Sequence, residues 1–400
     1  MICHTINIKK IKFEKISLRN TTDFKLLVLI SLVTFFTILT PRDVMGFKKM
    51  LLGLTLLMGF QSIINGLRNN IGILIFSIVL PALMYIVSTA STGSPTVAIK
   101  FLYPFAYILL VFPIVRYNID ILNITRNVCD IVALIIIVSC LLDYFNIVNV
   151  YENPLLILLN NNGDATTSIS DYAMFRYELF LNSSSIMFFS LTYYIKHNDK
   201  IRTLFIFIAL LLTGTRANIY IGTILLVFSM LVLSGKISIK ASIIIGILIV
   251  AGFFGGVLFE RYLIFELAKS SVDLSQLGTF TSILHAMDSD KSYWLTGMGF
   301  GSTFYDSGKL LFVDISDFSY LEFIREIGLP LSTVVFCFLL YPLLKLISID
   351  KFLFASYLAY LFVGVFEPFI FTSTGCFVIM MVYAEVVKHS NVRRNYMFYS

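Results

Sequence analysis

The chain has 400 residues, of which 58% are hydrophobic and only 14% are charged, whereas soluble domains are about 45–50% apolar and about 25% charged. This composition excludes an ordinary soluble enzyme, a disordered chain and a disulfide scaffold, and it predicts an integral membrane protein. The net charge of +6 comes without a basic patch interleaved with aromatic residues, so we expect no nucleic-acid partner. Contact with anionic membrane lipid accounts for the charge.

Apolar runs that approach the length of a membrane span, about 20 residues, recur along the whole chain. They predict an all-α, polytopic protein with a single transmembrane domain over residues 1–400 and about twelve transmembrane helices. The runs are 24–40, 47–65, 71–89, 97–115, 128–146, 179–195, 202–214, 217–234, 241–259, 327–347, 352–367 and 369–387.

The distribution of Lys and Arg predicts the orientation, because cytoplasmic loops carry the excess of positive charge. With the N-terminus in the cytoplasm, the cytoplasmic segments contain 19 of the 30 Lys and Arg residues. We therefore expect both termini in the cytoplasm. The short outer connections contain the exceptions, which are Arg42, Lys48, Lys49, Lys100 and Arg216.

Two predicted outer segments are long, one at 147–178 and one at 260–326. Loops beyond about 15 residues are usually functional or disordered. The second segment contains Phe280, Ile283, Leu284 and Met287 at the spacing of an amphipathic helix. We expect it to form an ordered, partly helical cap on the outer face.

A single arginine, Arg216, lies in the turn Thr213-Gly214-Thr215-Arg216 between two apolar runs. A charge at bilayer depth costs about 2.5–3.5 kcal/mol on insertion scales, which favours a functional role, and arginine suits bidentate phosphate contact. The alternative is an arginine that only extends to the lipid headgroups. Arg261 opens the second long loop at the outer surface and is a further candidate.

The stretch from Tyr293 to Gly301 combines aromatic residues with three glycines. The spacing G-x-G-x-G differs from the dinucleotide fingerprint G-x-G-x-x-G, so we reject nucleotide binding. Tyr293 and Trp294 either stack on sugar faces or pack within the loop. His285 lies on the predicted amphipathic helix and is either a packed residue or a ligand-binding one.

The segment 314–330 enters the next apolar run, and helical spacing places Glu322, Arg325 and Glu326 on one face. These residues form either an intrahelical ion pair or a functional charged face beside the membrane. Asp317 or Ser319 is expected to cap the helix.

In their order, these three segments resemble the O-antigen polymerase and O-antigen ligase family. The family has a small-polar-Arg turn, matched by 213–216, a G-x-G-aromatic-G stretch, matched by 297–301, and a His-Asn-x-Tyr-Leu box followed by Glu-x-Gly-Leu, here 317–321 and 326–329. The resemblance covers residues from about 200 to 387, and the first 200 match only in topology. Asp317 stands where the family box often has His, which disfavours the ligase mechanism and favours the polymerase branch.

The resemblance implies an enzyme of the bacterial inner membrane with its active site on the outer face. It would transfer a growing glycan from polyprenyl pyrophosphate to the non-reducing end of a new lipid-linked repeat unit, without cofactor or metal. A chain-length regulator and a flippase are implied partners. The implied pyrophosphate-binding residues are Arg216, Arg261 and Arg325; Asp317 or Glu322 would activate the acceptor; the expected glycan-binding residues are Tyr293, Trp294, Tyr320 and His285.

Three other functions stay open from the sequence. One is an O-antigen ligase, which uses the same donor and another acceptor. Another is a flippase, for which we would expect short loops on both sides. The last is a membrane protein of unrelated role whose charges lie at helix ends.

Overall fold

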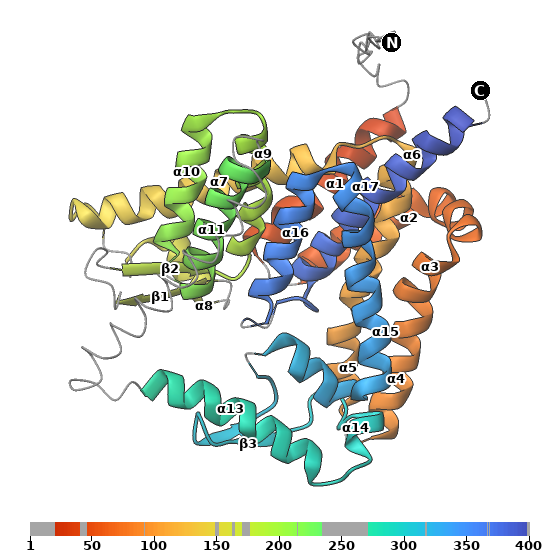
Figure 1. Ribbon diagram of the computed structural model, residues 1–400, viewed down its shortest axis with the longest axis vertical. Helices are drawn as coiled ribbons and strands as arrows, with labels where there is room; N and C mark the ends of the chain where they lie inside the picture. The colour runs from red at the N-terminus through yellow and green to blue at the C-terminus, as the bar shows by residue number, and fades with distance from the viewer. Residues whose placement is uncertain are drawn as a thin grey trace, which may run out of the picture.

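The computed structural model describes residues 21–40, 46–91, 93–148, 152–161, 165–169, 177–213, 215–233, 271–316, 318–365, 367 and 369–397. Helices dominate and pack together, and two short antiparallel hairpins accompany them (Figure 1). The predicted helix at 241–259 lies outside the described residues, as do Arg261 and Asp317.

The first part of the chain contains four helical segments. They are α1 (Thr21–Leu39), α2 (Phe47–Asn69), the run α3 (Ile71–Leu74), η2 (Ile75–Val79) and α4 (Leu80–Ala90), and the run α5 (Pro95–Leu102), η3 (Tyr103–Leu110) and α6 (Val111–Arg116). The four predicted apolar runs from 24 to 115 are thus helical. The η3 stretch is 3-10 helix with Pro104 in its first turn, where a proline that lacks an N–H interrupts α-helical bonding.

The next part contains α7 (Ile121–Tyr144), α8 (Pro154–Asn161), β1 (Ala165–Ile169), β2 (Tyr177–Leu181), η4 (Ser184–Ile186), α9 (Met187–Lys196), α10 (Lys200–Leu212), α11 (Arg216–Phe228) and η5 (Ser229–Leu233). Helix α7 begins seven residues before the predicted run, because the side chain of Asp120 accepts a hydrogen bond from Asn123 N and caps it. The predicted loop at 147–178 contains α8 and β1, and β1 pairs with β2. The helix predicted at 179–195 is wrong in its first residues, because β2 extends to Leu181 and α9 begins only at Met187.

The large loop forms α13 (Ser271–Asp288), α14 (Tyr293–Thr296), β3 (Phe304–Asp306) and β4 (Leu311–Val313), and it leads into α15 (Ser319–Ile349). We call the described residues from 271 to 327 the cap. The amphipathic helix predicted around 280–287 is confirmed as part of α13. Its buried face differs from the prediction: Ile283 and Met287 are buried against Phe304 of β3, whereas Phe280 is 41% exposed.

The chain ends with α15, α16 (Lys351–Val363) and α17 (Ser373–Met397). Helix α17 lies in the middle of the helical core, and its residues 376–384 are all buried. They are apolar on every side, which is the pattern of a helix surrounded by other helices. Helix α17 packs against η3, α6, α15 and α1.

The protein is an all-α, membrane-embedded protein. Within the described residues, five helical segments are long and apolar enough to span a membrane: Phe47–Arg68, Ile71–Ala90, Pro95–Arg116, Ile121–Tyr144 and Ser319–Ile349. The start of α1, the α9–α10 turn, the α15–α16 turn and the end of α17 lie at one end of the molecule. The cap lies at the opposite end, beside the turn between α4 and α5 (Figure 1).

Candidate functional site

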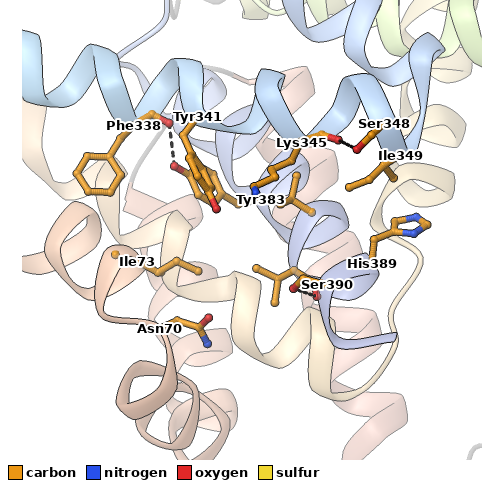
Figure 2. A pocket seen from close by; sticks show the side chains of 13 residues that line it. Asn70, Ile73, Phe338, Tyr341, Lys345, Ser348, Ile349, Tyr383, His389 and Ser390 are labelled. Carbon is orange, nitrogen blue, oxygen red and sulfur yellow. Dashed lines mark hydrogen bonds between the residues drawn. The ribbon is translucent and has the colours of Figure 1, made fainter. Parts of the chain in front are cut away.

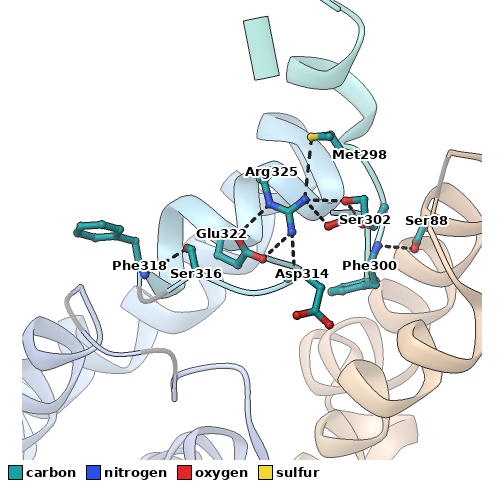
Figure 3. A network of polar contacts seen from close by, with 10 residues as sticks. Ser88, Met298, Phe300, Ser302, Asp314, Ser316, Phe318, Glu322 and Arg325 are labelled. Carbon is teal, nitrogen blue, oxygen red and sulfur yellow. Dashed lines mark hydrogen bonds and ion pairs between the residues drawn. The ribbon is translucent and has the colours of Figure 1, made fainter. Parts of the chain in front are cut away.

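The side chain of Arg325 lies at the centre of a buried polar network between α15 and the loops of the cap (Figure 3). Its Nε donates to Glu322 Oε2 at 2.9 Å, and its Nη2 donates to Glu322 Oε1 at 2.6 Å. Its Nη1 donates to the backbone oxygen of Ser302 at 3.0 Å and to Ser302 Oγ at 2.6 Å. Nη2 also donates to the backbone oxygen of Asp314 at 3.1 Å. Every N–H of the guanidinium therefore has an acceptor within the protein.

Arg325 is 0% exposed, and its guanidinium carbon lies 4.9 Å from the ring centre of Phe304. A buried charge is tolerated only when it is paired and hydrogen-bonded, and this arginine meets both conditions. The network joins the residues before β3, the residue after β4 and the first turns of α15. In this conformation the arginine organises the cap and has no donor left for a pyrophosphate.

Helix α15 is interrupted at Gly328, whose φ of 78° and ψ of 163° are not helical. The carbonyls before such a break have no partner within the helix, and here the glycine-rich loop supplies it. Met298 N donates to the backbone oxygen of Arg325 at 2.7 Å, and Gly299 N donates to that of Glu326 at 2.9 Å. The loop therefore binds the end of the first segment of α15 through its backbone.

The close approach of the two segments requires glycine on both sides. Gly297 has a φ of 73°, and a Cβ on it would lie 2.4 Å from the backbone oxygen of Glu326. A Cβ on Gly328 would lie 2.3 Å from the backbone oxygen of Leu295. Glycine is the residue that adopts positive φ without steric cost, so the G-x-G-x-G stretch and the Gly of Glu-x-Gly-Leu form one contact.

The same loop also contacts the α4–α5 turn. Phe300 N donates to Ser88 Oγ at 2.8 Å, and Ser94 N donates to the backbone oxygen of Phe300 at 2.8 Å. The rings of Phe300 and Phe101 are stacked with centres 5.4 Å apart. The loop thus joins α15 to the α4–α5 turn, and loop packing is the role that this structure gives its glycines and Phe300.

The predicted glycan-binding residues are not gathered into one site. Trp294 Nε1 donates to Asp288 Oδ1 at 2.8 Å, and Trp294 and Tyr293 are both half-buried. His285 is exposed on α13. Tyr320 turns toward the bundle instead, where its hydroxyl donates to the backbone oxygen of Leu361 at 2.8 Å. Only Tyr293, Trp294 and His285 remain near the outer surface of the cap.

The predicted capping of α15 by Ser319 is wrong. The N-cap residue is Phe318, with no side-chain cap, and Ser319 Oγ donates to the backbone oxygen of Glu367. Ser316 provides the nearby side-chain contact, because its Oγ accepts from Phe318 N at 3.3 Å. Ser319 therefore joins α15 to the α16–α17 connection.

The predicted site residue Arg216 is the first residue of α11, and its side chain lies outside the described part of the chain. The residue two positions on is well defined. Asn218 is buried, accepts a hydrogen bond from Ser185 Oγ at 2.9 Å and donates one to Ser184 Oγ at 2.8 Å. These contacts fix the start of α11, and hence the backbone of Arg216, against η4.

Three lysines in the predicted outer connections, Lys48, Lys49 and Lys100, have defined positions. Lys48 is 2% exposed, and its Nζ donates to Ser373 Oγ at 2.8 Å. Lys49 and Lys100 line a groove of about 350 Å³ between α2 and the α5–η3 run. In the sequence, their signal is that they lie in predicted outer connections, where the positive-inside rule predicts few lysines.

Carboxyl groups outside the spanning helices have shifted pKa values. Burial raises the pKa of Glu367, between α16 and α17, to about 8. The pKa of Asp290 lies below its usual value, because the carboxylate accepts a hydrogen bond from Ser292 N at 2.9 Å.

Comparison with known proteins adds no relative: no family model matches the chain, and no curated protein is similar to it at a significant level.

Proposed function

We propose that this protein is a polymerase of surface polysaccharide in the bacterial inner membrane. In this proposal about twelve helices span the membrane, both termini are cytoplasmic, and the cap faces outward. The observation that carries the proposal is the ordered cap fixed to one end of an apolar helical bundle. A glycosyl transfer between two lipid-linked substrates needs such a surface, because the lipids lie in the membrane while the sugars lie outside it.

The reaction transfers a glycan between two lipid carriers. A hydroxyl at the non-reducing end of a new repeat unit attacks the anomeric carbon of the growing chain. The bond from that carbon to polyprenyl pyrophosphate breaks, and the hydroxyl proton passes to a carboxylate. Positive charges beside the pyrophosphate stabilise the negative charge that develops on the leaving group.

We assign the pyrophosphate contacts to Arg216 and Arg261, and the proton acceptor to Asp317. The N–H groups of Arg325 already donate hydrogen bonds within the protein, and Glu322 is buried. These observations support a positioning role for this pair, which holds the loops of the cap against α15. Tyr293, Trp294 and His285 are the glycan-binding residues of the proposal, and no cofactor or metal takes part.

The test uses cells that lack the protein, whose surface polysaccharide is separated by size on a gel. Wild-type protein should restore the ladder, and Arg216→Ala should not. The control is Arg202→Ala, which changes an exposed arginine at the end of the molecule opposite the cap; this variant should restore the ladder fully. Without the protein, a single repeat unit should still reach its final acceptor.

Other outcomes of the same experiment would indicate a different function. Polymer that accumulates on the lipid carrier would indicate a ligase, and repeat units confined to the cytoplasmic face would indicate a flippase. An unchanged ladder in the deletion strain would refute the role in polysaccharide synthesis.

A further inference from the structure

A cavity of about 490 Å³ lies at the end of the molecule opposite the cap, between α3, α15 and α17 (Figure 2). The C-terminal parts of α15 and α17 and the junction between α2 and α3 line it. It is separate from the Arg325 network, which lies at the other end of α15. The role of this cavity does not depend on the proposed function.

One part of the cavity is apolar. Ile73, Phe338, Tyr341 and Tyr383 form its wall, and the ring of Phe338 is stacked on that of Phe76 at 4.8 Å. The hydroxyl of Tyr383 is already bound, because it donates to the backbone oxygen of Phe338 at 2.8 Å. This wall presents rings and aliphatic groups to an occupant.

The other part of the cavity is polar and positively charged. Lys345 extends from α15 toward Tyr383 (Figure 2), and Ser348, His389 and Ser390 line the same region. The described lining contains no Asp or Glu. The ammonium borders the apolar wall, because Lys345 Nζ lies 5.8 Å from the ring centre of Tyr341. An occupant therefore meets a cation and hydroxyl groups directly beside aromatic rings.

The positions of the lining residues along α15 match the layers of a membrane. Lys345 lies four residues before Ile349, where α15 ends, while Phe338 lies two turns further into the helix. If α15 spans the membrane, Lys345 and Ser348 lie on the headgroup side of the cavity and Phe338 lies on the acyl-chain side. Basic pockets between membrane helices at this level recognise anionic headgroups.

We propose that this cavity binds an anionic phospholipid, with its phosphate at Lys345 and Ser348 and one acyl chain against Phe338 and Ile73. Charge complementarity favours an anionic lipid over a zwitterionic one. Lys345 can bind the phosphate of either lipid, but the lining has no carboxylate to bind the ammonium group of a zwitterionic headgroup. The apolar wall favours a lipid over a free phosphate, because an acyl chain would bury the wall's apolar surface and a phosphate would not.

The experiment measures binding to the full-length protein in detergent, by thermal shift and by native mass spectrometry. The probes are phosphatidylglycerol, phosphatidylcholine and glycerol 3-phosphate. Phosphatidylglycerol should raise the melting temperature and stay bound in the mass spectrum, and the other two should do neither. Equal binding of phosphatidylcholine would overturn the anionic selectivity, and stabilisation by glycerol 3-phosphate would overturn the assignment to a lipid.

Two variants locate the effect in the cavity. Lys345→Ala should weaken phosphatidylglycerol binding about fivefold, as expected for one lysine at a lipid surface, whereas Lys351→Ala, an exposed lysine at the same end but outside the cavity, should not. Gly72→Leu should abolish lipid binding by filling the cavity. A Cβ at Gly72 meets only Phe338 Cε1 at 3.9 Å, so this variant should fold, which its elution on gel filtration verifies.

Equal affinities in wild type, Lys345→Ala and Gly72→Leu would show that phosphatidylglycerol binds elsewhere and would overturn the proposal.

Discussion

Arg325 shows how one side chain determines the position of a whole substructure. Its guanidinium binds Glu322, Ser302 and Asp314, which belong to three separate stretches of the cap. The face shared by Glu322 and Arg325 could be predicted from helical spacing. The acceptors at Ser302 and Asp314 could not, because no local pattern records which loop returns to a helix face.

We expect Arg325→Ala to be strongly destabilising. Removing one partner of a buried ion pair leaves the other charge uncompensated and costs about 3–5 kcal/mol. Thermal unfolding in detergent, followed by gel filtration, should show a large fall in melting temperature. The control Arg202→Ala removes an exposed pair with Asp199 and should change it little.

A double variant separates charge from packing. Arg325→Met combined with Glu322→Leu should regain much of the lost stability, because it removes both charges together. Equal melting temperatures for Arg325→Ala and Arg202→Ala would contradict the role of the buried network.

At the scale of elements, the apolar runs predicted most of the helices, because each continuous run has to satisfy its backbone hydrogen bonds within a helix. The irregular features could not be predicted in the same way. The β3–β4 hairpin has strands of only three residues each, which is too short for an alternation pattern. The break in α15 at Gly328 depends on a loop that lies some 30 residues earlier in the chain.

We expect Gly328→Ala to release the cap from the bundle. The added Cβ would lie 2.3 Å from the backbone oxygen of Leu295, and the φ of 78° would be strained as well. Limited proteolysis should therefore cleave the cap of the variant faster than that of the wild type. Gly53→Ala is the matched control, because nothing lies within 4 Å of its Cβ in α2. It should be neutral or stabilising by up to about 1 kcal/mol.

An unchanged cleavage rate in Gly328→Ala would show that the contact between the two glycine segments does not hold the cap in place.

The whole molecule has two unlike ends. The cap, with its hairpin and short helices, occupies one end. The α9–α10 and α15–α16 turns, next to Lys196 and Lys351, occupy the other. The composition predicted a membrane protein. The charge distribution predicts which end faces the cytoplasm, and this orientation stays a prediction. The arrangement of the helices around α17 could not be predicted, because every apolar run competes equally for the central position.

The proposed orientation can be tested with single cysteines in a chain whose native cysteines are replaced. Lys291→Cys in the cap should react with a membrane-impermeant maleimide in intact spheroplasts. Lys351→Cys at the start of α16 should react only after lysis, since both positions are exposed and lie at opposite ends. Labelling of both residues in intact spheroplasts would contradict the orientation.

The contact between Phe300 and the α4–α5 turn has a consequence for biosynthesis. The bond from Phe300 N to Ser88 Oγ joins residues 212 positions apart, and at about 5–20 residues per second the ribosome needs roughly 10–40 s to make that stretch. The α4–α5 turn is therefore made long before the loop that it contacts. Because the loop also needs the carbonyls of Arg325 and Glu326, the cap can dock only after the first segment of α15 has been made, and the central helix α17 is made later still.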